Sequence, residues 1–462
     1  MKNKKLTAFL LAAALAAASL SGCGTKQEET GKTTLTLGSW PDETQTEKVK
    51  LYNGYKDQLQ EKFPDLVIKT DTTNFSDAKI FSMKAVAKLL PTIYTTHFTE
   101  IQKTINSGYA GDVTEIMRER GLLDIINPTL LDTLKGSDGQ IYAFPQHAYM
   151  MGLVINKQLF QKAGLVNADG TVMVPDTYEQ LAEYAKQIKD KTGMAGFAIC
   201  TTNNWGGWHF MNIAWSYGVE FMKQGEDGKW KATFNTPEAV EALQYIKDLK
   251  WKYDVLPYDS AIDGTAINKL LGVSQCAMAI GVPTSDLTAQ YGLPVEDYAH
   301  GKLPAGPKGR YVQMGGGVYM FSPDASKEEL NAAFDWLDVK GAAKAALDDT
   351  AIANLEKNYK TTLETSGIVL PLSPLFMWSD PERVAKEQEI NAKYSNVDPK
   401  DFETYMDLTD VQLKSEEPVA CQELYGVLDQ CIQEVITNES ADCKAIIEKA
   451  NNDFQVNHLD QQ

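Results

Sequence analysis

Short strand patterns alternate with longer helical patterns along this 462-residue chain. Residues 34–37 alternate as a strand does, residues 46–63 have helical apolar spacing, and residues 66–68 form a second apolar run. This order predicts a βαβ unit, and its continuation predicts layers of helices packed on sheets. Because no repeat, low-complexity tract or Pro/Gly-rich linker divides the chain, we expect two interwoven α/β lobes and not two consecutive domains.

Local signals mark several element boundaries. Residues 177–180 and 326–329 have the spacing of a capping box, and residues 236–237 place a threonine before a first-turn proline. Residues 221–234 predict a β-hairpin that turns at Glu-Asp-Gly, residues 226–228. Three helix starts and one hairpin are therefore predicted.

The N-terminus is typical of a targeting segment. Lysines precede an apolar stretch at residues 6–20, which is shorter than the roughly 20 residues that span a bilayer. Residues 20–23, Leu-Ser-Gly-Cys, have the pattern of a bacterial lipobox, in which Cys23 is lipidated and becomes the mature N-terminus. We expect a signal peptide over residues 1–22 and a flexible tether over residues 23–32. The protein is then extracytoplasmic and anchored to the bacterial cell membrane by its acyl chains.

The charge balance excludes one class of partner. Lys and Arg number 44 against 62 Asp and Glu, which gives a formal net charge of −18. Nucleic-acid binders take much of their affinity from clustered cations, so we expect no nucleic-acid partner. With 43% hydrophobic residues, the chain is also too apolar for disorder.

Motifs of common enzymes are missing from the sequence. It has no G-x-S-x-G, H-E-x-x-H or G-x-G-x-x-G motif, and its five histidines are scattered. The cysteines beyond Cys23 are Cys200, Cys276, Cys421, Cys431 and Cys443. The spacing of the last three does not fit a zinc site, and the sequence does not decide whether two of them form a disulfide. We therefore expect no catalytic residue, no cofactor and no metal.

The stretch from residue 203 to residue 215, NNWGGWHFMNIAW, carries the clearest binding chemistry. Flat indole rings stack on the apolar C–H faces of sugars, amides satisfy the hydroxyls, and glycines allow a backbone or a ligand to approach closely. Trp205 and Trp208 lie among Asn/Gly turn residues, so we expect them to be exposed. Trp215 lies in an apolar run and is expected in the core.

Three further polar–aromatic clusters have the same character. Residues 40–43 (WPDE) follow the first predicted strand, at the carboxyl edge where open α/β sheets bind ligands. Residues 95–97 (TTH) end another candidate strand, and residues 145–149 (PQHAY) precede an apolar run. Each cluster is either a ligand-binding loop or an ordinary packed or solvated loop.

Four ordered patterns resemble those of the lipid-anchored extracellular solute-binding proteins, family 1, of ABC importers. They are YAFP at 142–145 followed by LVINK at 153–157 and FQKAGL at 160–165, PDTYEQL at 175–181, CAMAI at 276–280, and LPAGPKG at 303–309 before the glycines 315–317. The resemblance extends from the lipobox to the C-terminal helices, and the order and spacing of the patterns make it specific.

The resemblance implies a periplasmic-binding-protein-like fold, in which two α/β lobes are joined by crossing hinge segments and hold a ligand cleft between them. The expected first lobe comprises residues 33–147 and 302–350, and the second comprises residues 148–301 and 351–462. The chain is expected to cross between the lobes near residues 146–151, 298–303 and 345–365.

The resemblance also implies a site. The candidate ligand-binding residues are Trp40, Asp42, Glu43, Thr96, His97, Gln146, Tyr149, Asn204, Trp205, Trp208, Gly316 and Trp378. Thr284 stands where relatives often have a tryptophan, which puts sugar stacking at that position in doubt. Trp378 lies in a longer segment, residues 371–410, and either caps a ligand or packs.

Together these features imply a monomeric receptor that binds a sugar or oligosaccharide, closes on it, and presents it to ABC transporter permease subunits. Closure follows because groups on both lobes are satisfied together only in the closed state. The alternatives are a receptor for a peptide or polyamine and a surface-anchored glycoside hydrolase. Acidic loops and few arginines disfavour an anionic ligand.

Overall fold

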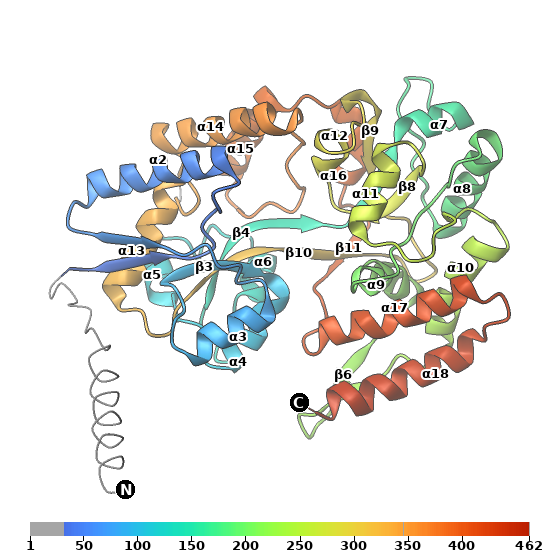
Figure 1. Ribbon diagram of the computed structural model, residues 1–462, viewed down its shortest axis with the longest axis horizontal. Coiled ribbons are helices and arrows are strands. Elements are labelled where there is room, and N and C mark those ends of the chain that lie inside the picture. Colours follow the sequence, from blue (N-terminus) through green and yellow to red (C-terminus); the bar gives the residue numbers. More distant parts are fainter. Residues whose placement is uncertain (1–31, 345, 462) are drawn as a thin grey trace, which may run out of the picture.

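The structure is a computed structural model that describes residues 32–344 and 346–461, so the predicted signal peptide and nearly all of the tether lie outside the described residues. Two lobes lie side by side in Figure 1, and each has its own buried apolar core. The two α/β lobes predicted from the sequence are confirmed. None of the helices that the structure describes has the length and apolarity of a membrane-spanning segment.

A six-stranded mixed sheet forms the centre of the first lobe and extends through β10 (Arg310–Phe321) to β11 (Val411–Lys414) beside the second lobe. Its other strands are β1 (Thr34–Leu37), β2 (Val67–Thr70), β3 (Ile93–His97) and β4 (Ala143–Met150). The order is β11-β10-β3-β1-β2, with β4 also paired to β10. β1 is parallel to β2 and β3, whereas β10 is antiparallel to β3 and β4. The carboxyl ends of β1 and β3 therefore lie at one edge of the sheet.

Helices pack around this sheet. They are α2 (Thr46–Lys62), α3 (Ala78–Val86), α4 (Ile101–Asn106), α5 (Thr114–Glu119), α6 (Pro128–Thr133) and α13 (Lys327–Val339), with the 3₁₀ turn η1 (Phe98–Glu100) after β3. α13 packs against α2 and β1. In β1 burial alternates, because Leu35 and Leu37 point into the core. The βαβ unit predicted from the first strand, helix and second strand is confirmed.

The second lobe contains a three-stranded antiparallel sheet in the order β8-β5-β9. Its strands are β5 (Gly152–Asn156), β8 (Met278–Gly281) and β9 (Tyr298–Gly301), and all of β5 is buried. The predicted hairpin is present as β6 (Met222–Gln224) and β7 (Trp230–Ala232).

Helices make up most of the second lobe. They are α7 (Lys157–Ala163), α8 (Tyr178–Thr192), α9 (Trp205–Tyr217), α10 (Pro237–Trp251), α11 (Gly264–Gly272), α12 (Asp286–Ala289), α16 (Glu403–Met406), α17 (Cys421–Thr437) and α18 (Cys443–Phe454), with the short turns η2 (Val295–Asp297), η3 (Pro399–Phe402) and η4 (Gln455–Leu459). The three predicted helix starts are confirmed, since Thr177, Thr236 and Ser326 each cap a helix with the side chain.

The chain passes between the lobes where strands meet. β4 ends at Met150 in the first sheet and β5 begins at Gly152 in the second, while β9 leads into β10 in the opposite direction. Near the centre of Figure 1, β4 and β10 lie beside each other between the lobes. A third connection runs through α14 (Asp349–Ser366) and α15 (Pro381–Tyr394), which pack on each other.

One segment departs from the expected lobe boundary. The range 351–462 was assigned to the second lobe, but the backbone N–H of Asn127 donates to the carbonyl of Met377 at 2.8 Å. The side chain of Trp378 is only 2% exposed and lies in the core of the first lobe. Residues 377–378 therefore return to the first lobe before α15 begins.

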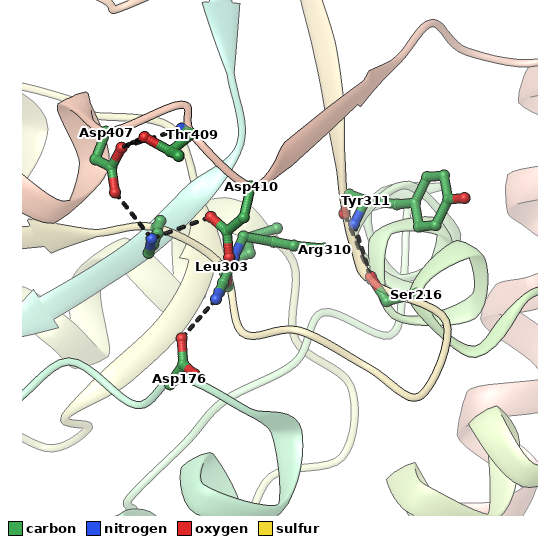
Figure 2. Close-up of polar contacts among 9 residues, drawn as sticks. Asp176, Ser216, Leu303, Arg310, Tyr311, Asp407, Thr409 and Asp410 are labelled. Atoms are coloured by element: carbon green, nitrogen blue, oxygen red, sulfur yellow. Dashed lines mark hydrogen bonds and ion pairs between the residues drawn. The ribbon is translucent and has the colours of Figure 1, made fainter.

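Buried Arg310 fastens the crossing at the start of β10 (Figure 2). Its guanidinium lies 2.6 Å from Asp176 Oδ1 and 3.0 Å from Asp410 Oδ2, and it donates to the carbonyl of Leu303. Lys302 forms a second ion pair with Asp410, at 3.1 Å. These contacts tie together three segments: the one that precedes α8, the one that leaves β9, and the one that precedes β11.

All five cysteines in the described part of the chain are buried and free: Cys200, Cys276, Cys421, Cys431 and Cys443. Burial raises the pKa of each thiol, so each stays protonated at neutral pH. The disulfide left open by the sequence is not formed.

Replacing Arg310 by methionine tests the crossing. The Arg310→Met variant leaves the buried carbonyl of Leu303 without its donor, so we expect the free energy of unfolding to fall by about 1–3 kcal/mol. Denaturant unfolding monitored by circular dichroism measures this loss. Lys386→Ala is the control, because it removes an exposed pair with Glu389 and should cost less than about 1 kcal/mol. Equal losses in the two variants would contradict a stabilising role of Arg310 at the crossing.

Candidate functional site

A cavity of about 320 Å³ lies between the lobes. The first lobe contributes the end of β3 and η1, the crossing strands contribute one residue each, and the second lobe contributes the start of α9 and residues in and before α17. The lining residues are His97, Phe98, Thr99, Tyr149, Asn203, Asn204, Trp205, Trp208, Gly316, Glu416, Gln422 and Tyr425. A ligand held here contacts both lobes at once.

A carboxylate from α17 holds the start of α9. Asp429 Oδ2 accepts a hydrogen bond from the backbone N–H of Asn204 at 2.8 Å, and Oδ1 accepts one from Gly207 at 2.7 Å. The first N–H groups of a helix have no partner within it, and the side chain of Asn204 does not cap α9. Asp429 therefore acts as the cap from a neighbouring helix and fixes where α9 begins.

Two glycines let α9 lie directly on α17. A Cβ added to Gly207 would be 2.4 Å from the carbonyl oxygen of Tyr425, and one added to Gly206 would be 2.5 Å from Asp429 Oδ1. These distances are shorter than any real Cβ contact, so only glycine fits. The sequence predicts that a backbone or a ligand approaches the glycine pair closely, and in the structure it is the backbone of α17.

Two indole rings from α9 form an aromatic wall of the cavity. The rings of Trp205 and Trp208 are 5.3 Å apart and nearly perpendicular, at 84°. Trp205 lies against Gly264 and is still 40% exposed, and Tyr149 of β4 stands edge-on to Trp208 at 6.5 Å. The predicted exposure of Trp205 is confirmed, whereas Trp208 is half-buried. Trp215 lies in the core, as predicted.

The turn before α9 has an uncommon backbone. Asn203 and Asn204 have φ values of 59° and 68°, in the left-handed region that asparagine tolerates better than most residues. Their side-chain amides donate to Asp263 at 3.1 Å and to Gln422 at 3.3 Å. The two asparagines thus shape the turn that presents the tryptophans, besides lining the cavity.

Gly316 of β10 lines the cavity, and Gly315 beside it lies under the ring of Tyr149. A Cβ added to Gly315 would be 2.7 Å from the hydroxyl of Tyr149, and one added to Gly316 would be 2.2 Å from the carbonyl of His147 and 3.1 Å from the ring of Phe98. The rings of Tyr149 and Phe98 therefore lie directly on the strand, where any other residue would displace them.

Glu416 is the only carboxylate among the residues that line the described cavity. Its Oε1 accepts a hydrogen bond from the hydroxyl of Tyr425 at 2.7 Å, and that hydroxyl accepts one from Gln313 Nε2 at 3.0 Å. Burial raises the pKa of Glu416 to about 7, because its effect exceeds that of the hydrogen bonds from Tyr425 and Trp208, which lower it.

Half of the predicted ligand-binding residues meet at this cavity: His97, Tyr149, Asn204, Trp205, Trp208 and Gly316. Trp40 does not, because Ser39 turns the chain with a φ of 52° and the indole packs on Trp336 at 5.9 Å in the first-lobe core. Asp42 and Glu43 are exposed on the turn into α2. These three residues therefore lie outside the cavity lining.

The remaining candidates also lie outside the cavity lining. Thr96 is buried and pairs with Val318 of β10, and Gln146 is half-buried beside Gly317. Trp378 packs, with the Arg383 guanidinium 4.0 Å from its ring centroid. Of the two alternatives left open for Trp378, packing is the one observed.

Six lining residues were not in the predicted set: Phe98, Thr99, Asn203, Glu416, Gln422 and Tyr425. Asn203 is adjacent to a predicted residue, and Gln422 and Tyr425 share a helix face by their spacing of three. Nothing in the sequence indicates which lobe that face meets. Among the described residues, no group of three or more His, Cys, Asp or Glu side chains is placed to hold a metal ion.

A family model of bacterial extracellular solute-binding proteins matches residues 46–346. The chain belongs to this family. A Brucella abortus (strain 2308) protein named as a binding protein is 26% identical over 241 residues, 51% of this chain and 54% of that protein. The chain thus spans about half the length of the curated relatives it matches.

Solved structures share the whole fold. An Arthrobacter globiformis cyclic α-maltosyl-1,6-maltose binding protein is 21% identical, with a TM-score of 0.65 over 92% of this chain and 100% of that one. A Listeria monocytogenes ABC substrate-binding protein in complex with cycloalternan is 18% identical, with a TM-score of 0.66 over 92% and 98%. A Mycobacterium tuberculosis protein in complex with glycerophosphocholine is 16% identical, also with a TM-score of 0.66 over 92% and 98%. These likenesses show the two-lobe solute-binding fold.

The contact between α9 and α17 can be tested with a matched pair of glycine substitutions. We expect Gly207→Ala to lower the free energy of unfolding by about 1–3 kcal/mol, because the methyl group collides with the backbone of Tyr425. A Cβ added to Gly54, also within a helix, would meet only the flexible end of Lys357 at an ordinary 3.6 Å, so Gly54→Ala should be neutral or stabilising by up to about 1 kcal/mol. Denaturant unfolding compares the two, and a neutral Gly207→Ala would refute the close contact.

Proposed function

We propose that this solute-binding protein is the receptor of an ABC importer for a sugar or oligosaccharide. The observation that carries the proposal is the pair of indole rings, Trp205 and Trp208, in a cavity lined by both lobes. Indole faces stack on the C–H faces of sugar rings, and the amides of Asn203, Asn204 and Gln422 are placed to bond hydroxyls.

The placement of the cavity couples binding to lobe closure. His97 and Phe98 belong to the first lobe and Trp205 and Trp208 to the second, so a ligand that touches all four favours the arrangement in which the lobes are close. The crossing strands β4 and β10 are the segments through which such a motion passes. The closed form then differs from the open one in the surface offered to permease subunits.

Two further observations support a carbohydrate receptor. Similar structures hold or are named for cyclic α-maltosyl-1,6-maltose, cycloalternan and maltose. A glycoside hydrolase of the usual kind requires two carboxyl groups at the bond it cleaves, and the described cavity lining includes only Glu416.

Alanine substitution at the two tryptophans tests the proposal. We expect Trp205→Ala and Trp208→Ala each to weaken binding of a sugar by about 1–3 kcal/mol, as loss of a central aromatic contact does. Calorimetric titration with a panel of mono- and oligosaccharides measures the change. Trp251→Ala is the control, because Trp251 has similar exposure, 38%, and lies on α10 outside the cavity. If no sugar of the panel binds the wild type, the proposal fails.

We also propose that Cys23 carries the lipid anchor and that the protein acts outside the cytoplasm. Cys23 ends a lipobox pattern, and two acyl chains hold a protein at a membrane stably. Cys23→Ser should move the protein from the membrane fraction to the soluble fraction and abolish incorporation of labelled palmitate. Cys443→Ser, which changes a buried thiol, should leave both unchanged. Membrane retention of Cys23→Ser would contradict the anchor.

A further inference from the structure

The cavity holds an acidic group without a cationic partner. None of the residues that line the described cavity is lysine or arginine, and Glu416 has no ion pair within the part of the chain that the structure describes. The nearest lysine along the chain, Lys414, points elsewhere, with its ammonium 4.8 Å from the ring centroid of Trp215. The charge of Glu416 is thus left for something other than this chain to balance.

The groups around Glu416 add to its negative charge and do not balance it. Glu100 of η1, on the opposite lobe, raises the pKa of Glu416 further by repulsion. The other titratable groups near the carboxyl are Tyr149, Cys421 and Tyr425, which burial keeps protonated and neutral, and the exposed His97 on β3. Two carboxyl groups therefore give the cleft a negative potential, which favours a positively charged guest.

Aromatic rings surround the same position. Trp208 lies near enough to Glu416 to lower the pKa of its carboxyl. The ring centroids of Tyr149 and Trp205 are 6.5 Å and 5.3 Å from that of Trp208. Phe98 of the first lobe lines the same cavity. Rings of this kind attract ammonium groups through their electron-rich faces, most strongly where water is excluded.

We propose that the ligand carries a cationic nitrogen, as an amino sugar does, and that Glu416 pairs with it within the cage of Trp205, Trp208, Tyr149 and Phe98. This inference rests on the proposed sugar-binding function and specifies the ligand class. A neutral sugar gives the ionised form of the carboxyl no counter-charge, whereas an ammonium group supplies it and favours that form. The site therefore selects by charge as well as by shape.

Calorimetry with matched ligands tests the proposal. The probes are disaccharides of two linkages, each as the hydroxyl, amino and N-acetylamino form, together with choline, which has a quaternary ammonium group and no sugar ring. We expect the amino form of one linkage to bind wild type at least ten-fold more tightly than its hydroxyl form. This ratio should fall to about one in Glu416→Gln and stay unchanged in Glu417→Gln, because Glu417 faces Trp215 outside the cavity.

A second readout does not depend on a variant. At pH 7 about half of the Glu416 carboxyl groups are protonated, so binding of a trimethylammonium disaccharide to wild type should release up to about half a proton, measured by calorimetry in two buffers of different ionisation enthalpy. The preference for this permanently charged ligand over its hydroxyl form should weaken as the pH falls from 8 to 6, since Glu416 becomes neutral.

The outcomes separate the two proposals. Binding of a hydroxyl disaccharide that is equal to or tighter than that of its amino form overturns the cation inference and leaves the sugar receptor intact. If choline binds as tightly as any amino sugar, the cation inference stands and the sugar-receptor proposal is wrong. If no probe binds, both proposals fail.

Discussion

The candidate site depends on one contact between two helices of the second lobe. Asp429 of α17 accepts hydrogen bonds from Asn204 and Gly207 at the start of α9, and the glycine pair brings the helices together without side chains between them. This contact aims the tryptophans of α9 into the cleft. Since Gln422 and Tyr425 lie on the first turns of α17, the same contact places the aromatic wall and the polar groups of the cavity at a fixed separation.

Helix α9 also connects the cavity with the crossing between the lobes. The backbone N–H of Tyr311 donates to Ser216 at 3.1 Å (Figure 2). That of Gln313 donates to Asn212 at 2.7 Å, so β10 follows one side of α9. Further along, β10 contributes Gly316 to the cavity lining and then pairs with β3 in the first lobe. Strand β10 therefore connects the cleft with the segment that Arg310 holds. Through this strand a ligand can influence the relative position of the lobes.

Local chemistry was readable from the sequence, whereas long-range packing was not. The caps at Thr236 and Ser326 depend on neighbouring residues only, and the family patterns established the two lobes. Trp40 looked like a ligand residue because it follows β1, but its partner Trp336 lies almost 300 residues away and no local pattern reveals it. Glu416 was missed for the same reason, since its environment is made by Tyr425 and the opposite lobe.

The five free thiols have a consequence for how the protein matures. Each is buried and protonated, so thiol exchange with external oxidants is slow, and no cross-link supports either lobe. Folding of the described residues therefore includes no disulfide-forming step. The described part of the chain can accordingly be produced in a reducing cytoplasm without loss of a native cross-link.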